Sequence, residues 1–212
     1  MLLLACLAAS PGPAGASGAR YEEILYWDDG SANTTYPPAV PNWPWNTLAV
    51  RFQAPGWART VVGMRFYTLN DQVQHPDDPD LPTTQPVICW VWRPNEESTP
   101  GVPANDGYTP FTGFGEYPED SWIEARFPTP IDITDPEHFP DGWFFVGIEW
   151  LYPRNPILGL DTDEPTYGHT VRPGEGGAEW LSSDVLIRAI VSSEWSPIDA
   201  SSWTHIKTLF QD

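Results

Sequence analysis

The sequence predicts an all-β protein: a jelly-roll-like β-sandwich of two antiparallel sheets, with long loops and a short C-terminal helix. Apolar and polar residues alternate with a period of two along most of the chain. Helical periodicity is almost absent before the last dozen residues. The 25 prolines and 17 glycines indicate many short elements joined by turns, and 212 residues is a usual length for one all-β domain.

Residues 1–19 have the pattern of a secretory signal peptide. A short apolar run from Leu2 to Ala9 precedes small residues suited to cleavage, at 14–16 and at 17–19. The segment Leu3–Cys6 also matches a lipobox, so a lipid anchor at Cys6 is an alternative that we favour less. We therefore expect a secreted protein with a signal peptide over 1–19, a sandwich domain over 20–192 and a tail over 193–212.

Nine segments of the domain have strand character. Alternation is clearest in "TLAVRFQ" (47–53), "VVGMRFYT" (61–68), "WFFVGIEW" (143–150) and "DVLIRAIVS" (184–192). Further strands are predicted at 23–27, 87–93, 122–127, 167–172 and 178–181. Strands alternating with helices would predict a parallel sheet, and that pattern is missing. Residues 70–86 and 94–120 are rich in Pro, Gly and Asp, so they are predicted to be long loops.

The tail differs from the rest of the chain. Ser201 or Ser202 is a suitable N-cap for a short helix. The helix would place apolar side chains on one side, namely Trp203, Ile206, Leu209 and Phe210. We expect it to dock on its own domain, with docking on a partner as the alternative.

The charge balance excludes some function classes. With 10 Lys+Arg against 29 Asp+Glu the formal net charge is −19, a field that repels phosphate backbones and anionic lipids. We expect no nucleic-acid partner. No run beyond the leader approaches the length of a membrane span. After cleavage only Cys89 remains, in the strand-like "PVICWVWR", and it is predicted to be a buried, inert thiol.

The order of several segments resembles a class of secreted bacterial β-sandwich domains, jelly-roll-like accessory modules of large extracellular proteins. The segments include "YWDDG", "VVGMRFY", "VICWVW", "FFVGIEW", "ILGLDTDEP" and "DVLIRAIV", and the resemblance covers roughly residues 21–192. It implies a non-catalytic extracellular module. It brings no catalytic residues to this chain.

Aromatic residues in loops are the candidate ligand-binding groups. Indole and phenyl rings stack on the C–H faces of sugars, and neighbouring amides and carboxylates accept or donate hydroxyl hydrogen bonds. The candidates are Trp43, Trp45, Asn46, Tyr108, Phe111 and Phe114, with Asn105 and Asp106 beside them. The alternative for each indole is a plug that closes one end of the core. The strand tryptophans Trp90, Trp92 and Trp150 are assigned to the core.

Asp161, Asp163 and Glu164 are the candidate metal ligands. These acids fall within four residues of "LDTDEPTYG", and a hard cation such as calcium binds several carboxylate oxygens. Any calcium ion there would have a structural role, and solvated acids without an ion are the alternative. The "DDG" segment, Asp28 to Gly30, is interpreted as a turn rather than a second ion site.

These patterns favour a secreted, non-catalytic binding or adhesion module for extracellular polysaccharide. The alternative is a structural or protein-interaction domain of the cell surface with no small ligand. A third hypothesis is a glycan-active enzyme, for which Glu149 and Asp161 are the carboxylate pair to inspect. No motif of a hydrolase nucleophile, zinc protease or phosphate loop is present, so a non-catalytic role is favoured.

Overall fold

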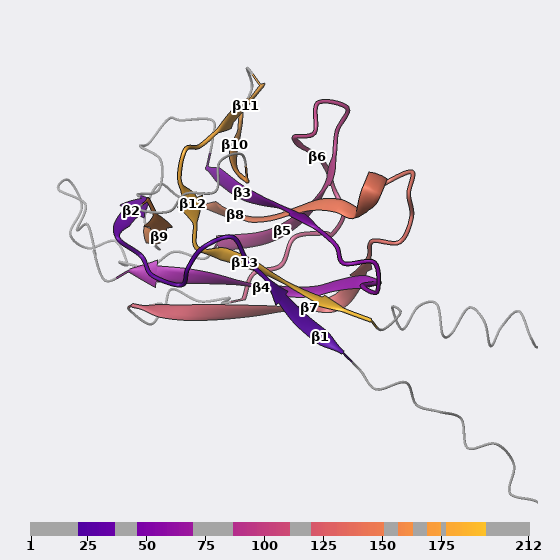
Figure 1. The fold of residues 1–212 in the computed structure, drawn as a ribbon, viewed down its shortest axis with the longest axis horizontal. Coiled ribbons are helices and arrows are strands. Elements are labelled where there is room, and N and C mark those ends of the chain that lie inside the picture. Colours follow the sequence, from indigo (N-terminus) through magenta and orange to yellow (C-terminus); the bar gives the residue numbers. More distant parts are fainter. Residues whose placement is uncertain are drawn as a thin grey trace, which may run out of the picture.

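A computed structural model describes residues 21–36, 46–69, 87–110, 120–150, 157–162, 169–174 and 177–193. In these ranges the chain forms thirteen strands and one short 3-10 turn, η1 (Pro140–Gly142). The strands build two antiparallel sheets that lie face to face (Figure 1). The predicted all-β, two-sheet sandwich is therefore confirmed. The signal peptide and the C-terminal helix were predicted for residues outside the described ranges.

The first sheet has seven strands. Its main path runs β1–β13–β4–β9–β12, β7 pairs with the other edge of β4, and β2 pairs with β9. The strands are β1 (Glu22–Leu25), β2 (Thr34–Tyr36), β4 (Thr60–Leu69), β7 (Ser121–Asp132), β9 (Ile157–Asp161), β12 (Asp184–Val185) and β13 (Ile187–Ser192). Most of its neighbours are far apart in sequence, so the sheet depends on long-range pairing.

The second sheet has six strands in the order β11–β10–β3–β8–β5–β6. They are β3 (Thr47–Gln53), β5 (Val87–Pro94), β6 (Pro100–Pro103), β8 (Trp143–Trp150), β10 (Thr170–Gly174) and β11 (Gly177–Trp180). The prediction that 94–120 contains no strand was wrong, because β6 lies within it. An edge strand tolerates proline, since its outer N–H groups need no partner in the sheet.

The core fills the space between the sheets, as the alternation predicted. Leu48, Val50 and Phe52 of β3 are at most 1% exposed and point inward. Phe144, Val146 and Ile148 of β8, all 0% exposed, lie beside them in the same cluster. The opposite sheet contributes, among others, Met64, Phe66, Ile187 and Ala189. Burying this apolar surface is the main stabilising contribution to the fold.

The tryptophans of β5 lie on the other side of their sheet. Trp150 belongs to the inner core as predicted, and buried Cys89 also points inward. Trp90 and Trp92 alternate with Cys89 and therefore face outward, where they cluster with Phe145. Trp92 is 7% exposed and Trp90 packs against its cluster, so both belong to a second, smaller hydrophobic cluster on the outer face of this sheet rather than to the one between the sheets. Cys89 is a free, buried thiol as predicted, and burial raises its pKa so that it stays protonated.

A wide bulge interrupts β7. Val61 of β4 is opposite Ile131, but Gly63 is opposite Arg126, so the residues between Arg126 and Ile131 oppose a single residue of β4. This stretch is "FPTP", and its two prolines lack the N–H groups that would continue the ladder. The chain therefore bows out of the sheet here and forms part of the rim described below.

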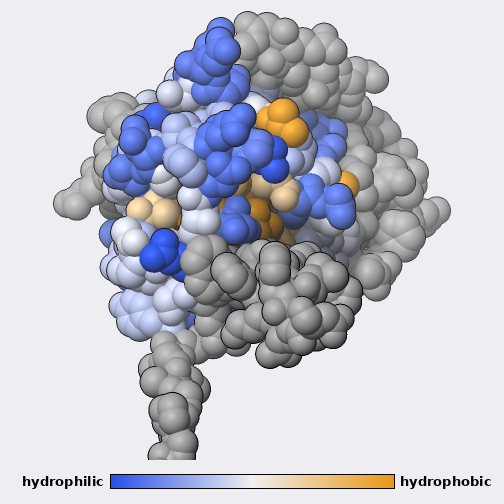
Figure 2. Space-filling view, turned by 90° about the vertical axis from the view of Figure 1, so that its right-hand side faces the viewer, coloured by the Kyte–Doolittle hydropathy of each residue, from blue (hydrophilic) through white to orange (hydrophobic). Residues whose placement is uncertain are grey.

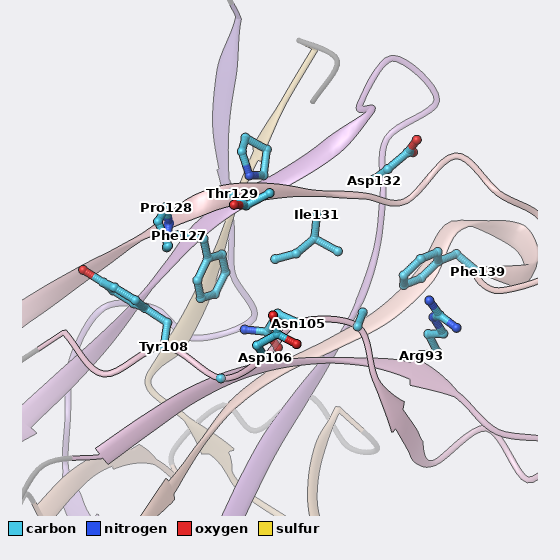
Figure 3. Close-up of a pocket in the computed structure, with 13 residues that line it drawn as sticks. Arg93, Asn105, Asp106, Tyr108, Phe127, Pro128, Thr129, Ile131, Asp132 and Phe139 are labelled. Carbon is cyan, nitrogen blue, oxygen red and sulfur yellow. The ribbon is translucent and has the colours of Figure 1, made fainter. Parts of the chain in front are cut away.

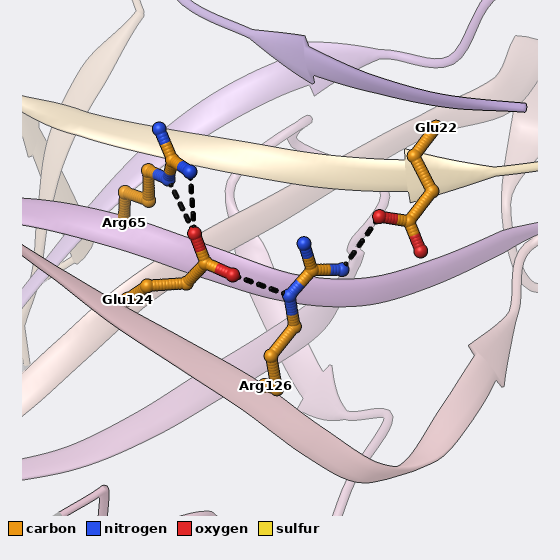
Figure 4. Close-up of polar contacts among 4 residues, drawn as sticks. All are labelled: Glu22, Arg65, Glu124 and Arg126. Carbon is orange, nitrogen blue, oxygen red and sulfur yellow. Dashed lines mark hydrogen bonds and ion pairs between the residues drawn. The ribbon is translucent and has the colours of Figure 1, made fainter.

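Charged side chains on the outer face of the first sheet form a chain of ion pairs (Figure 4). Glu124 binds Arg65 at 2.5 Å and Arg126 at 2.6 Å, and Arg126 binds Glu22 at 2.8 Å. Burial raises the pKa of Glu124, but hydrogen bonds from the two arginines outweigh it and hold that pKa below its usual value. This series of ion pairs links β1, β4 and β7 across the sheet.

The two ends of the described domain lie side by side. The Tyr21 N–H donates to the hydroxyl of Ser193 at 3.2 Å, and the Ser193 N–H donates to the Tyr21 carbonyl at 3.0 Å. Both residues lie at the same end of the β1–β13 pair, at the lower right of Figure 1. Among the described residues, no helix is both long enough and apolar enough to cross a membrane.

Candidate functional site

A pocket of about 580 Å³ opens between the edges of the two sheets. One wall comes from the end of β5 and the segment that follows β6. The opposite wall comes from the bulge of β7, and Phe139 closes one end. The lining residues are Arg93, Ala104, Asn105, Asp106, Gly107, Tyr108, Phe127, Pro128, Thr129, Pro130, Ile131, Asp132 and Phe139. Segments from three parts of the sequence therefore meet here.

The floor of the pocket is apolar and aromatic. The rings of Tyr108 and Phe127 meet edge to face, with centroids 6.1 Å apart and planes at 84°. Ile131 and Phe139 lie beyond them and are largely buried (Figure 3). Such a surface can pack against the C–H face of a pyranose ring.

Asn105 holds the first wall in place. Its side-chain oxygen accepts from the Val91 N–H at 2.9 Å, and its side-chain amide donates to the Cys89 carbonyl at 3.2 Å. Tyr108 then pairs with Cys89 through both backbone bonds, at 2.7 and 3.0 Å. The segment thus continues along the edge of β5 where the regular ladder has stopped. Asn105 thus lines the pocket beside Tyr108, while its side-chain amide is hydrogen-bonded to the backbone of β5.

Three charged side chains surround the apolar floor. Arg93 lies below Phe139, at the end of the pocket opposite Tyr108. Asp106 lies between Arg93 and Tyr108 (Figure 3). The Asp132 carboxylate points away from the cavity (Figure 3), where it accepts from the Thr134 N–H and hydroxyl at 2.8 and 2.7 Å. Arg93 and Asp106 are therefore the two charged groups directed at the cavity itself.

Two of the predicted ligand-binding residues, Asn46 and Tyr108, lie in the part of the chain that the structure describes. Tyr108 lines the pocket, whereas Asn46 immediately precedes β3. Three strand spacings, together about 14 Å, and an offset from Val87 to Cys89 along β5 separate Asn46 from Tyr108, so the two residues are not neighbours. Trp43, Trp45, Phe111 and Phe114 lie outside the described residues, so the choice between platform and plug stays open.

Asp161 is the described member of the predicted calcium group. It is 1% exposed, and its carboxylate accepts from the Asp29 N–H at 3.2 Å. Asp163 and Glu164 lie outside the described ranges. Within those ranges no group of three or more His, Cys, Asp or Glu is placed to hold a metal, and calcium binding stays a prediction. The "DDG" turn is confirmed: the Asp29 carboxylate accepts from the Ser31 N–H, and Gly30 has a φ of +94°.

Glu149 and Asp161, the carboxylate pair of the enzyme hypothesis, belong to different sheets. Glu149 faces outward from β8 and accepts from the indole N–H of Trp90 at 2.8 Å. Asp161 is buried at the end of β9. The structure does not bring the two together in the pocket.

A second group of aromatic and cationic side chains lies near β3 and β10 of the second, six-stranded sheet. The ring of His169 stacks on Trp27 with centroids 3.7 Å apart, and the Trp27 indole donates to the Arg51 carbonyl at 2.7 Å. Arg51 itself lies 4.7 Å from the ring of Trp143 and 4.9 Å from that of Trp180. Burial, helped by the nearby Arg51 charge, lowers the pKa of His169 below its ordinary value of 6.5.

This environment predicts a loss of stability at mildly acidic pH. The unfolded chain gains a proton on His169 near pH 6.5, whereas the folded chain gains it only at lower pH. Stability from the neutral ring is therefore complete above 6.5 and is lost as the pH falls through the folded pKa. Thermal melts of the natural protein and a His169→Gln variant between pH 7.5 and 5 would test this. As the pH falls, the Tm of the natural protein should decrease more steeply than that of the variant. Equal slopes of Tm against pH for the two proteins would contradict the prediction.

The surface around η1 and β6 is largely hydrophilic. Figure 2 views the molecule from this side and shows mostly blue among the coloured atoms, with small separate orange areas. On this side the described residues form no broad apolar patch of the kind that marks many protein interfaces.

One sequence signal could have located Arg93. Val87, Cys89 and Val91 of β5 are buried and alternate, so the next residue on that face is Arg93. The alternation therefore sends a charged side chain toward the inside of the sandwich. The bulge residues opposite it gave no such signal, since "FPTP" resembles a loop.

No protein-family model matches the chain, and no curated protein matches it. Among solved structures, the fold is similar to that of a clostridial cysteine protease, Cwp84, in a variant form after propeptide cleavage. The match has a TM-score of 0.50 and 12% sequence identity, and it covers 82% of this chain and 40% of that chain. The chain thus spans less than half the length of that neighbour. At this identity the likeness shows the fold alone.

Proposed function

We propose that this protein is a secreted, non-catalytic binding module for extracellular polysaccharide, and that the pocket between the sheet edges is its sugar site. The supporting observation is the pocket's composition: an apolar, aromatic floor with Arg93 and Asp106 directed at it. The leader-like residues 1–19 support the extracellular location.

The pocket offers the interactions that a sugar needs. Tyr108 and Phe127 offer apolar contact to ring C–H groups, the Asp106 carboxylate accepts from hydroxyls, and the Arg93 guanidinium donates to them. The volume of about 580 Å³ lies in the range of small-molecule sites, and it suits one or two sugar residues.

The edges beside the pocket disfavour the alternative of a protein partner that adds a strand there. Among the described residues β7 pairs only with β4, and β6 pairs only with β5, so each has a free edge. Pro128 and Pro130 interrupt the free edge of β7, and Pro100 and Pro103 stand at the two ends of β6. Proline cannot donate to an added strand, so these edges are poor templates for one.

Calorimetric titration of the protein with a panel of soluble polysaccharides and their oligosaccharides tests the proposal, with and without calcium. We expect saturable binding to at least one neutral or acidic glycan. An Asp106→Ala variant should bind it about tenfold more weakly or worse, because a hydrogen bond to a charged group contributes about 1.5–3 kcal/mol. Asp106 is exposed on the rim, so the variant should keep the Tm of the natural protein.

Glu97→Ala is the matched control. Glu97 is an exposed acid between β5 and β6 that does not line the pocket, so its loss changes net charge by the same amount. The control should bind as the natural protein does. Equal weakening in both variants would assign the effect to overall charge, and no binding to any glycan would reject the proposed function.

A further inference from the structure

Nearly all of the arginines in the described ranges interact with other groups. Seven lie in the described ranges: Arg51, Arg59, Arg65, Arg93, Arg126, Arg172 and Arg188. Arg65, Arg126, Arg172 and Arg188 pair with carboxylates. Arg51 lies between two indoles, and Arg59 also has an interaction partner. This is the expected outcome where 29 acidic residues compete for 10 cations.

Arg93 is the exception among the described arginines. Its side chain makes no ion pair or ring contact with the described residues, and its Nε is shielded from solvent with no hydrogen-bond partner there. The alternation of β5 directs the side chain inward, and the guanidinium reaches the end of the pocket below Phe139 (Figure 3). A cation at a partly desolvated position is costly unless something pairs with it.

Arginine is well suited to one kind of acceptor. Its planar guanidinium presents parallel N–H groups that match the two oxygens of a carboxylate, and this paired hydrogen bond is stronger than a bond to a neutral hydroxyl. Asp106 also lines the pocket and forms no ion pair with Arg93. The two groups can therefore bind different parts of one ligand. Arg93 would donate to an acceptor of the ligand, and Asp106 would accept from its hydroxyl groups.

We infer that Arg93 is a specificity-determining residue for a carboxylate, and that the pocket takes a uronic acid residue carried by an otherwise neutral saccharide. The inference rests on the proposed function and adds the ligand's charge to it. The saccharide carries a single carboxylate at this position because a polyanionic chain would meet both the Asp106 carboxylate and the net charge of −19.

Matched pairs of small sugars isolate the carboxylate. The probes are the methyl glycosides of glucuronic, galacturonic and mannuronic acid, each compared with the methyl glycoside of glucose, galactose or mannose. The members of a pair differ only at C6, which is a carboxylate in the uronate and a hydroxymethyl group in the hexose. Affinities come from ¹⁵N-labelled protein titrated by NMR at physiological salt. We expect at least one uronate to bind about tenfold or more tightly than its hexose.

The arginine side-chain N–H signals provide a second readout that does not depend on affinity. The Nε–H cross-peak absent from the spectrum of an Arg93→Lys variant belongs to Arg93. It should move on addition of the uronate and stay still on addition of the hexose. Arg93→Gln should lose the preference for the uronate but keep the weaker hexose binding, and Arg65→Gln, on the outer face of the other sheet, should keep both.

The outcomes separate the two proposals. If a hexose binds as tightly as its uronate, or if Arg93→Gln keeps the preference, the inference about Arg93 fails and the sugar site stands. If no sugar of either kind binds and the larger glycans also fail, both are rejected. A folded Arg93→Gln variant is expected, because the side chain that it shortens has no partner among the described residues.

Discussion

Replacing Asp28 by alanine is expected to lower the free energy of unfolding by about 3–5 kcal/mol. The Asp28 side chain is 0% exposed, and it binds Arg188 through the Nη2 atom and through Nε, which lies 3.2 Å from both carboxylate oxygens. The Arg188 guanidinium also lies 4.0 Å from the ring of Trp122. Without Asp28, a mostly buried cation would remain with no anion against it. Urea unfolding followed by tryptophan fluorescence measures the change.

Two companion variants test the cause of that loss. Glu124→Gln removes the carboxylate that pairs with Arg65 and Arg126. The three side chains are 33%, 35% and 43% exposed, so the change should cost no more than about 1 kcal/mol. Asp28→Ala combined with Arg188→Met should recover part of the stability, because the second change removes the unpaired charge. A double variant as unstable as the sum of the single ones would show that the two residues act independently.

Gly147→Ala is expected to be the other severe substitution, with a loss of about 3 kcal/mol or more. A Cβ at this position would lie 2.1 Å from the Leu48 carbonyl oxygen and 2.7 Å from the Ala49 Cα. Those atoms belong to the backbone of β3, the strand paired with β8, so no side-chain rotation relieves the contact. Glycine in a strand marks such a close approach of a second backbone.

Gly56→Ala is the control for the loss of a glycine as such. A Cβ there would meet nothing within 4 Å, and its φ lies outside the left-handed range. The variant should be as stable as the natural protein or slightly more so, since alanine restricts the unfolded chain. Melting temperatures of the two variants, measured side by side, should differ widely. Similar values would remove steric contact as the explanation at Gly147.

The sequence predicted the fold wherever one face of a strand is wholly apolar. In β3 and β8 the period-two pattern identified both the strand and the buried face. It was less specific where both faces are apolar, and it failed where the ladder is broken. Trp90 and Trp92 are as apolar as the residues between the sheets, and their alternation with Cys89 places them in the smaller cluster on the outer face. The bulge of β7 follows from two prolines, and prolines equally favour a loop.

The pocket was harder to predict than the fold. Its walls come from residues 93, 104–108, 127–132 and 139, and nothing in the linear sequence states that these segments meet. Tyr108 was predicted because aromatic residues in a loop are typical of sugar-binding sites. Arg93 was not predicted, because the sequence does not show which arginines have partners. The structural role of Asn105 is visible only after the strands are paired.

The adjacency of Tyr21 and Ser193 has a mechanical consequence. If the domain is pulled through these two points, β1 and β13 separate from the same end, starting with the pair Glu22 and Ser192 and ending with Leu25 and Ala189. The hydrogen bonds between the two strands then break one after another, because the force acts mainly on the pair at the opening end. Tension along the chain would release β1 at low force and leave the pairing of β13 with β4 to resist afterwards.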